Sequence, residues 1–174
     1  MKVHSFKGLW LHYGLAGTGK TRDLIRTAIS YAGQGKRVCF VGTEMTPSSI
    51  CLRIAQIAHD QGYTGDVSGI NVFALEPGDG ISAIRDILNQ ASFDVLLVDC
   101  MDLLTYNDLL DITPAENAHN LSIGFKALSN IHRIPVMATV QSRRMSADSV
   151  EVVSQASFDA SFVDIVTHTN PGPT

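Results

Sequence analysis

The segment from Gly14 to Thr21 matches the pattern G-x-x-x-x-G-K-[ST], which is typical of a phosphate-binding loop, or P-loop. Glycines in such a loop allow tight turns, so that successive backbone N–H groups point at phosphate oxygens. Lys20 can reach the β- and γ-phosphates, and the hydroxyl of Thr21 can bind Mg²⁺. The sequence therefore predicts that the chain binds a nucleoside triphosphate. The residues expected to hold it are Gly14, Ala16, Gly17, Thr18, Gly19, Lys20, Thr21 and Arg22.

Asp99 is the first candidate outside this loop. It follows the apolar run 95–98, and four apolar residues before an acid are the form of a Walker B strand, expected here over 94–99. At the carboxyl end of a strand beside the P-loop, the carboxylate of Asp99 can hold Mg²⁺ directly or through water. The alternative is an ordinary surface carboxylate at the end of a strand.

Glu44 and Gln141 also follow expected strands, over 37–43 and 135–140. A carboxylate at the position of Glu44 can orient and deprotonate the water that attacks the γ-phosphorus. A neutral amide at the position of Gln141 can sense the γ-phosphate and relay its loss to the following loop. The alternatives are a solvated glutamate at the start of a loop and an ordinary polar loop residue.

Arg143 and Arg144 form an adjacent basic pair on the loop that leaves Gln141. They can contact nucleic-acid phosphates or a neighbouring nucleotide, and the alternative is a solvated pair. The sequence offers no platform of interleaved aromatic and basic residues on which bases would stack. The segment 103–113 is acidic, which also counts against DNA binding there.

The composition narrows the class of protein. A length of 174 residues with 45% hydrophobic content suits one globular domain with a sizeable core. A net charge of −4 excludes a uniformly basic nucleic-acid coat but leaves room for a local basic patch. Cys39, Cys51 and Cys100 lie in apolar stretches without C-x-x-C spacing, so we expect buried, reduced thiols and no zinc site. Without a signal peptide or a membrane-spanning run, we expect a cytoplasmic protein that contacts no membrane.

Strand-like runs alternate with helical ones, which favours an α/β fold with a mostly parallel sheet flanked by helices. Strands are expected over 9–13, 37–43, 70–75, 93–99, 135–140 and 162–167, and helices over 21–32, 47–61, 81–90 and 114–132. Thr46 and Thr113 are expected to cap helices that start with proline, and Glu116 completes a capping box. The helix after the P-loop should begin at Gly19, and 141–159 should be a loop.

The order of these motifs resembles the C-terminal ATPase domain of DnaB-type replicative hexameric DNA helicases, within the RecA-like superfamily. The resemblance extends from about Gly8 to the C-terminus. It rests on the P-loop, on Glu44-Met45-x-Pro47 followed by Arg53, on Asp99, on Lys126-Ala127-Leu128, on Ile134-Pro135-Val136 and on Gln141-x-x-Arg144.

The resemblance implies one RecA-like ATPase domain over 1–174 that uses ATP and Mg²⁺. Lys20 and Thr21 would then hold the phosphates and the metal ion, and Asp99 would be the Walker B carboxylate. Glu44 would be the catalytic base, and Gln141 would be a γ-phosphate sensor coupled to a DNA-contacting loop over 142–157.

The sequence departs from these helicases in two respects. They carry an N-terminal domain and a linker helix, whereas this chain begins almost at its first strand. They also place a Lys-x-Arg pair after the last strand, where this chain has Thr167-His168-Thr169-Asn170. Arg143 or Arg144 could replace this arginine finger, a partner subunit could complete the site, or hydrolysis could be slow.

We therefore expect a minimal helicase-like ATPase that acts on single-stranded DNA in replication or recombination. It would work as a homo-oligomer, with a ring as one form, or with a larger helicase or replication partner. Its compactness suggests an origin in a phage or mobile element. The alternatives are a RecA-like recombination or annealing accessory protein and a nucleotide-dependent regulatory module without helicase activity.

Overall fold

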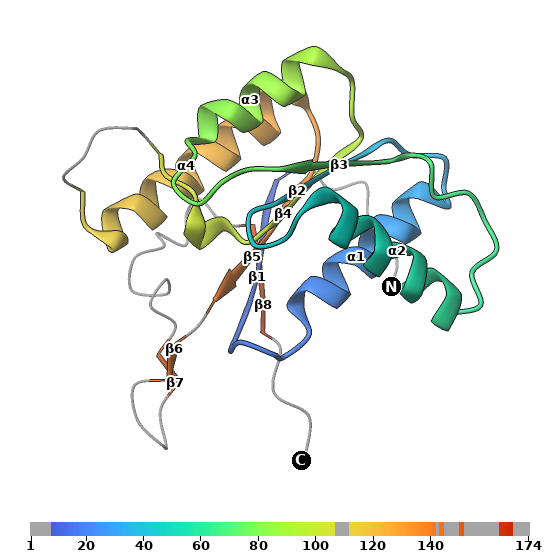
Figure 1. Ribbon diagram of the computed structural model, residues 1–174. Helices are drawn as coiled ribbons and strands as arrows, with labels where there is room; N and C mark the ends of the chain where they lie inside the picture. The colour runs from blue at the N-terminus through green and yellow to red at the C-terminus, as the bar shows by residue number, and fades with distance from the viewer. Residues whose placement is uncertain (1–7, 107–111, 142, 145–149, 152–163, 169–174) are drawn as a thin grey trace.

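Six strands form one parallel sheet in the described part of the chain, and helices cover both of its faces (Figure 1). The computed structural model describes residues 8–106, 112–141, 143–144, 150–151 and 164–168. The strands are β1 (Leu9–Gly14), β2 (Val38–Gly42), β3 (Ile70–Ala74), β4 (Val95–Asp99), β5 (Val136–Gln141) and β8 (Ile165–His168). They lie in the order β3-β2-β4-β5-β1-β8, and each neighbouring pair is parallel. The prediction of an α/β fold with a mostly parallel sheet is confirmed.

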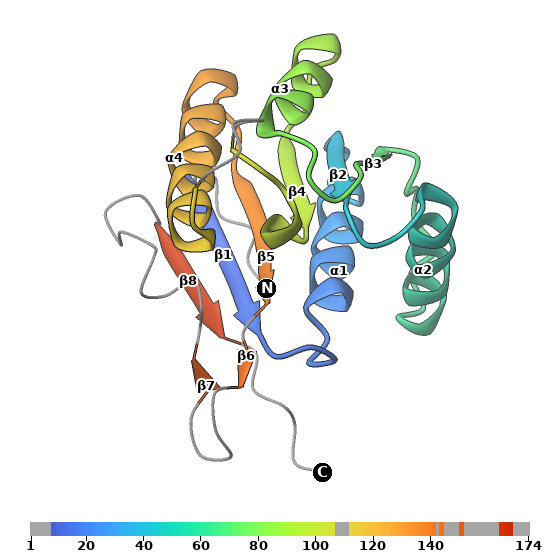
Figure 2. The same cartoon turned by 60° about the vertical axis from the view of Figure 1, so that its left-hand side comes forward.

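Two helices pack on each face of the sheet (Figure 2). The helices are α1 (Lys20–Ala32), α2 (Pro47–Asp60), α3 (Ile81–Gln90) and α4 (Pro114–His132). Buried side chains of α1 and α2 share one core cluster, and those of α3 and α4 share the other. The residues that the helices contribute to these clusters are apolar and at helical spacing, which explains why the sequence predicts all four helices.

The central strand β4 shows how the sheet separates the two cores. Val95 and Leu97 pack with the side chains of α1 and α2, whereas Leu96 and Val98 pack with those of α3 and α4. All five residues of β4 are buried, as expected for a parallel strand that is covered on both faces. Asp99 ends this strand, so the surrounding core determines where its carboxylate lies.

Threonine caps fix the starts of α2 and α4. Thr46 Oγ1 accepts a hydrogen bond from the backbone N–H of Ser49 at 3.3 Å. Thr113 Oγ1 accepts one from the backbone N–H of Glu116 at 3.2 Å, and Glu116 Oε2 accepts the backbone N–H of Thr113 at 2.8 Å. The predicted caps and the predicted capping box are confirmed.

The segment predicted as a loop after β5 contains further extended structure. Gln141 is the last residue of β5, and β6 (Arg143–Arg144) pairs antiparallel with β7 (Val150–Glu151). Strands of two residues carry no alternation of apolar and polar positions, so periodicity could not predict them. The last strand covers 165–168, and residues 162–163 of the predicted 162–167 strand lie outside the described residues.

Cys51 corrects the prediction that all three thiols are buried, because its side chain is exposed on α2. The buried stripe of this helix is Ile50, Ile54 and Ala58, and Cys51 lies about 100° around the helix from Ile50. Cys39 and Cys100 are buried as predicted. Burial raises the pKa of the Cys39 thiol to about 12, so it stays protonated near neutral pH. No helix in the described ranges has the length and apolar character that a membrane span requires.

Candidate nucleotide-binding site

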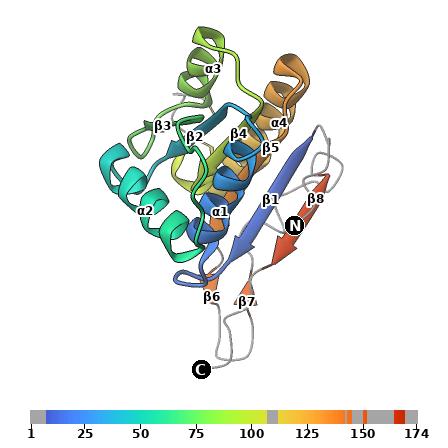
Figure 3. The ribbon, with the colours of Figure 1, turned by 90° about the vertical axis from the view of Figure 1, so that its right-hand side faces the viewer.

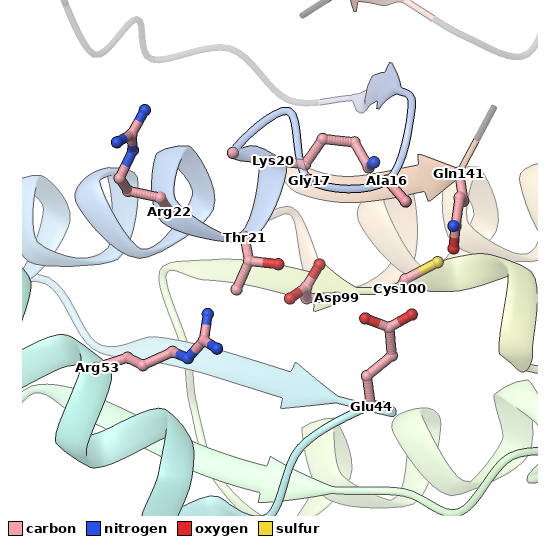
Figure 4. A pocket seen from close by; sticks show the side chains of 11 residues that line it. Ala16, Gly17, Lys20, Thr21, Arg22, Glu44, Arg53, Asp99, Cys100 and Gln141 are labelled. Carbon is pink, nitrogen blue, oxygen red and sulfur yellow. The ribbon is translucent and has the colours of Figure 1, made fainter. Parts of the chain in front are cut away.

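A pocket of about 350 Å³ brings together the P-loop and the ends of three other strands (Figure 4). Parallel strands place their carboxyl ends at the same edge of a sheet, where α/β proteins bind their ligands. The pocket is lined by Ala16, Gly17, Gly19, Lys20, Thr21, Arg22, Glu44, Arg53, Asp99, Cys100 and Gln141. The structure thus gathers the candidate catalytic and metal-binding residues, which are up to 121 positions apart in the chain, at one place.

The P-loop connects β1 to α1 through glycines in the left-handed region of backbone conformation. Gly17 has φ 77° and Gly19 has φ 95°, values that favour glycine. The helix begins at Lys20 and not at Gly19 as predicted, because a left-handed residue cannot belong to a right-handed helix. Gly19 provides no side-chain cap, so the first N–H groups of α1 can serve a bound anion.

Lys20 extends along the P-loop, where its ammonium group is held by backbone carbonyls. Its Nζ donates hydrogen bonds to the carbonyl oxygens of Gly14 at 2.7 Å and Leu15 at 2.8 Å. The hydroxyl of Thr18 also donates to Leu15, at 2.8 Å. These bonds keep a positive charge beside the N–H groups of the loop, which is the electrostatic environment that phosphate requires.

Asp99 offers one buried carboxylate oxygen toward a cation. Its side chain is 3% exposed, and its Oδ1 accepts a hydrogen bond from Thr139 Oγ1 at 2.5 Å. Its Oδ2 is buried and has no hydrogen-bond partner among the described residues. The hydroxyl of Thr21 points toward this carboxylate (Figure 4). A hydroxyl and a carboxylate oxygen are suitable ligands for Mg²⁺, so these two residues fit the ion that the P-loop pattern implies.

No group of three or more His, Cys, Asp or Glu side chains in the described ranges could hold a metal ion by itself. A Mg²⁺ ion at Thr21 and Asp99 would therefore take its other ligands from phosphates and water, which is how this ion commonly binds in nucleotide sites.

Glu44 reaches the pocket from the end of β2, and the preceding residue holds it beside β4. The buried Thr43 donates its hydroxyl to the carbonyl of Cys100 at 3.0 Å and accepts the Cys100 N–H at 2.9 Å. Its own N–H donates to the carbonyl of Asp99 at 2.8 Å. The sequence pattern does not by itself indicate Thr43 as part of the site. Its position directly before Glu44 is the only feature of the sequence that points to it. Its hydrogen-bond partners depend on the register of β2 and β4, which the sequence does not show.

Gln141 ends β5 and lies opposite Gly14, the first residue of the P-loop, in the pairing of β1 and β5. Its backbone N–H donates to Asp102 Oδ2 at 2.5 Å, and the thiol of Cys100 donates to the same oxygen at 3.1 Å. Burial raises the pKa of the Cys100 thiol, and the neighbouring Asp102 charge raises it further, so the thiol remains a donor. The sequence pattern does not indicate Cys100 or Asp102 as part of the site.

Four arginines named in the sequence analysis lie at different places relative to the pocket. Arg22 lines the pocket but points away from Thr21 and Asp99, and its guanidinium lies over Gly19 (Figure 4). Arg53 reaches the pocket from α2 and was identified only through the family resemblance. Arg143 and Arg144 form β6, which lies beyond the carboxyl ends of β1 and β8 (Figure 3). Most of the candidate DNA-contact loop, 142–157, lies outside the described residues.

Comparisons with known proteins address the fold. No protein-family model matches the chain, and a search of curated proteins gives no match. Among solved structures, one ATPase domain is similar with a TM-score of 0.74 and 16% sequence identity, over 93% of this chain and 69% of that chain. A DnaB-like replicative helicase, solved in a study of its interactions with primase, has a TM-score of 0.73 and 13% identity, over 93% of this chain and 48% of that chain.

The predicted resemblance is therefore confirmed at the level of the fold. One similar structure is an isolated ATPase domain and the other is a DnaB-like helicase, and each match covers nearly all of this chain. This chain has the RecA-like fold of the ATPase domains of DnaB-type replicative helicases.

Proposed function

We propose that this chain is a Mg²⁺-dependent ATPase of the helicase type, built as a single RecA-like domain over 1–174 and acting on single-stranded DNA. The observation that carries the proposal is the pocket at the carboxyl edge of the sheet. There the P-loop faces two carboxylates and an amide, Glu44, Asp99 and Gln141, from the ends of three other strands. The fold shared with helicase ATPase domains supports the same function.

In this mechanism the backbone N–H groups of the P-loop and the ammonium of Lys20 bind the phosphates. Thr21 and Asp99 would hold Mg²⁺, which neutralises charge on the phosphate oxygens when it is bound. Glu44 takes a proton from water as the water oxygen bonds to the γ-phosphorus and the bond to the β-phosphate oxygen breaks. The products are ADP and phosphate, and the side chain of Gln141 responds to the loss of the γ-phosphate.

The DNA-binding part of the proposal concerns the segment that leaves Gln141. Arg143 and Arg144 follow the proposed sensor almost directly, and their guanidinium groups can bind backbone phosphates. We place the DNA contact in the loop 142–157. Very few residues would then separate Gln141 from the DNA contact, so a movement of Gln141 on γ-phosphate release would be transmitted directly to the DNA.

The ATP site also needs a cation from elsewhere. The stretch Thr167–Asn170 contains no lysine or arginine, and an arginine finger can contribute several orders of magnitude to turnover. We propose that a neighbouring subunit, in a ring or another homo-oligomer, or a larger replication partner completes the site. Mass measurement of the chain with and without ATP tests for the homo-oligomer.

ATP turnover with and without single-stranded DNA tests the proposed function. We expect DNA to stimulate turnover, and we expect Lys20→Ala to abolish it by removing the cation that binds the phosphates. Glu44→Gln should keep nucleotide binding and lower turnover by about 10²- to 10⁴-fold, the usual contribution of a general base. The matched control is Glu76→Gln, because Glu76 is an exposed glutamate just after β3 and lies outside the pocket.

Each alternative predicts a different result. A rate of ATP turnover that is the same with and without DNA would contradict a DNA motor. DNA binding and ATP turnover without strand separation would favour a recombination or annealing accessory protein. ATP binding without turnover would favour a regulatory module, which the absence of lysine and arginine from Thr167–Asn170 makes the second candidate.

A further inference from the structure

Asp102 is an acidic residue that the mechanism above does not use. It lies in the short 3₁₀ helix η1 (Met101–Leu103), directly after β4. The backbone pairing of β4 with β5 ends at Val98 and Ala138. Beyond that pair, side chains connect the two strands. Thr139 donates to Asp99, and the backbone N–H of Gln141 donates to Asp102 Oδ2 at 2.5 Å.

The backbone of Gln141 is therefore held from two sides. On one side it lies opposite Gly14, where the P-loop begins. On the other side it bonds to the carboxylate of Asp102, which also accepts the thiol of Cys100 at 3.1 Å. Cys100 lines the ATP pocket next to Asp99. One carboxylate oxygen thus connects the pocket wall at the end of β4 to the backbone of the proposed sensor.

We propose that Asp102 is a positioning residue that holds Gln141 in place relative to Asp99 and the P-loop. The proposal rests on the proposed function, because it assigns Asp102 a role in the response of Gln141 to the γ-phosphate. Hydrogen bonds to a charged acceptor are short and directional, so the bond fixes where β5 ends and where the next segment begins. A shift of about 1 Å in a catalytic group can reduce turnover by as much as 10²-fold.

A double-mutant cycle with Gln141 tests this role through turnover. We expect Asp102→Ala to lower kcat about 10-fold and to change the KM for ATP less than about 2-fold, because the P-loop contacts remain. In a Gln141→Ala background, Asp102→Ala should lower kcat by less than about 2-fold more, because its effect passes through Gln141. Asp102→Asn keeps an oxygen acceptor and should restore part of the loss. Asp86→Asn, an exposed acid on α3, is the control.

Amide hydrogen exchange gives a readout that requires neither nucleotide nor turnover. In the ¹⁵N-labelled chain, the amide of Gln141 should exchange at least about 10-fold faster in Asp102→Ala than in the wild type. Amides in the middle of β5, such as that of Ala138, should be unchanged.

These outcomes separate the two proposals. Equal exchange rates at Gln141, or full additivity in the mutant cycle, would overturn the role of Asp102 and leave the ATPase proposal intact. A wild-type chain without ATP turnover would contradict the ATPase proposal. The hydrogen-exchange rates at Gln141 would then be the measurement that decides whether Asp102 holds Gln141 in place.

Discussion

At the scale of single residues, the two carboxylate oxygens of Asp99 differ in their hydrogen bonding. Asp99 has one oxygen bonded to Thr139 and one buried oxygen with no partner among the described residues. A buried carboxylate oxygen without a partner destabilises the folded state, because it has lost its hydration. The same oxygen is an available ligand for a cation. Asp99 therefore lowers the stability of the metal-free protein and at the same time favours metal binding.

The first prediction follows from this unpaired oxygen. Asp99→Asn replaces the buried carboxylate by a neutral amide, which costs less to bury, and it should raise the free energy of unfolding without Mg²⁺ by about 1 kcal/mol. For a chain of this size, that corresponds to a rise in Tm of about 2–4 °C. The variant should also lose most of the Mg²⁺ dependence of ATP binding, which titration calorimetry measures. Thr139→Val is the matched control, because it removes the donor to Oδ1 and should lower Tm.

At the scale of elements, the carboxyl end of β2 packs closely against the start of α2. Gly42 is the last residue of β2, two residues before Glu44. A Cβ atom at this position would lie 2.4 Å from Cδ1 of Ile50, which is fully buried at the start of α2. A side chain at this position would therefore have to displace the buried Ile50 side chain, which glycine avoids. The close approach of α2 to the strand also determines how the segment with Glu44 leaves the sheet.

This packing gives a prediction about two coupled substitutions. Gly42→Ala should lower the free energy of unfolding by about 1–3 kcal/mol, the usual effect of overpacking a core. Ile50→Val removes Cδ1 and should restore part of that loss in the double variant, although it destabilises the protein when made alone. Urea denaturation of the four proteins measures the coupling. Strictly additive losses would show that α2 moves freely away from the strand.

The elements also show what the sequence could and could not predict. All four helices and the strands of the central sheet were predicted to within about three residues, because apolar spacing and the threonine-proline caps define them. The strands β6 and β7 were not predicted, since two residues carry no periodicity. Within the site, Glu44, Asp99 and Gln141 were found as polar residues at strand ends. Thr43 and Asp102 were missed, because their partners depend on how neighbouring strands are aligned.

At the scale of the whole molecule, the pocket connects parts of the chain that are otherwise separate. It takes residues from the segments after β1 and β2, from the end of β4 and the residue after it, from the end of β5 and from α2. The strands among these elements, β2, β4, β5 and β1, are neighbours in the sheet, and α1 and α2 cover the same face of it (Figures 1 and 2). A ligand in the pocket would therefore contact segments that are distant in the sequence, and its binding should stabilise the folded state.

The corresponding prediction is a thermal shift with nucleotide. At about 100 times its dissociation constant, ATP with Mg²⁺ should add about 2.7 kcal/mol to the free energy of unfolding. In a chain of this size, that raises Tm by about 5–11 °C. Lys20→Ala should remove the shift, whereas Glu44→Gln should keep it, because Glu44 acts on the attacking water. A shift that persists in Lys20→Ala would place the nucleotide outside the P-loop.

The polarity of the parallel sheet has a practical consequence for protein engineering. All strand ends that build the pocket lie at one edge, so the turns from each helix into the next strand lie at the other. The turn over 61–69, between α2 and β3, is mostly exposed and contributes no residue to the pocket. Exposed turns of this kind accept inserted sequence. A fluorescent reporter inserted after Thr64 would therefore label the molecule at the end remote from the nucleotide. The motion of the labelled protein could then be followed while ATP is turned over.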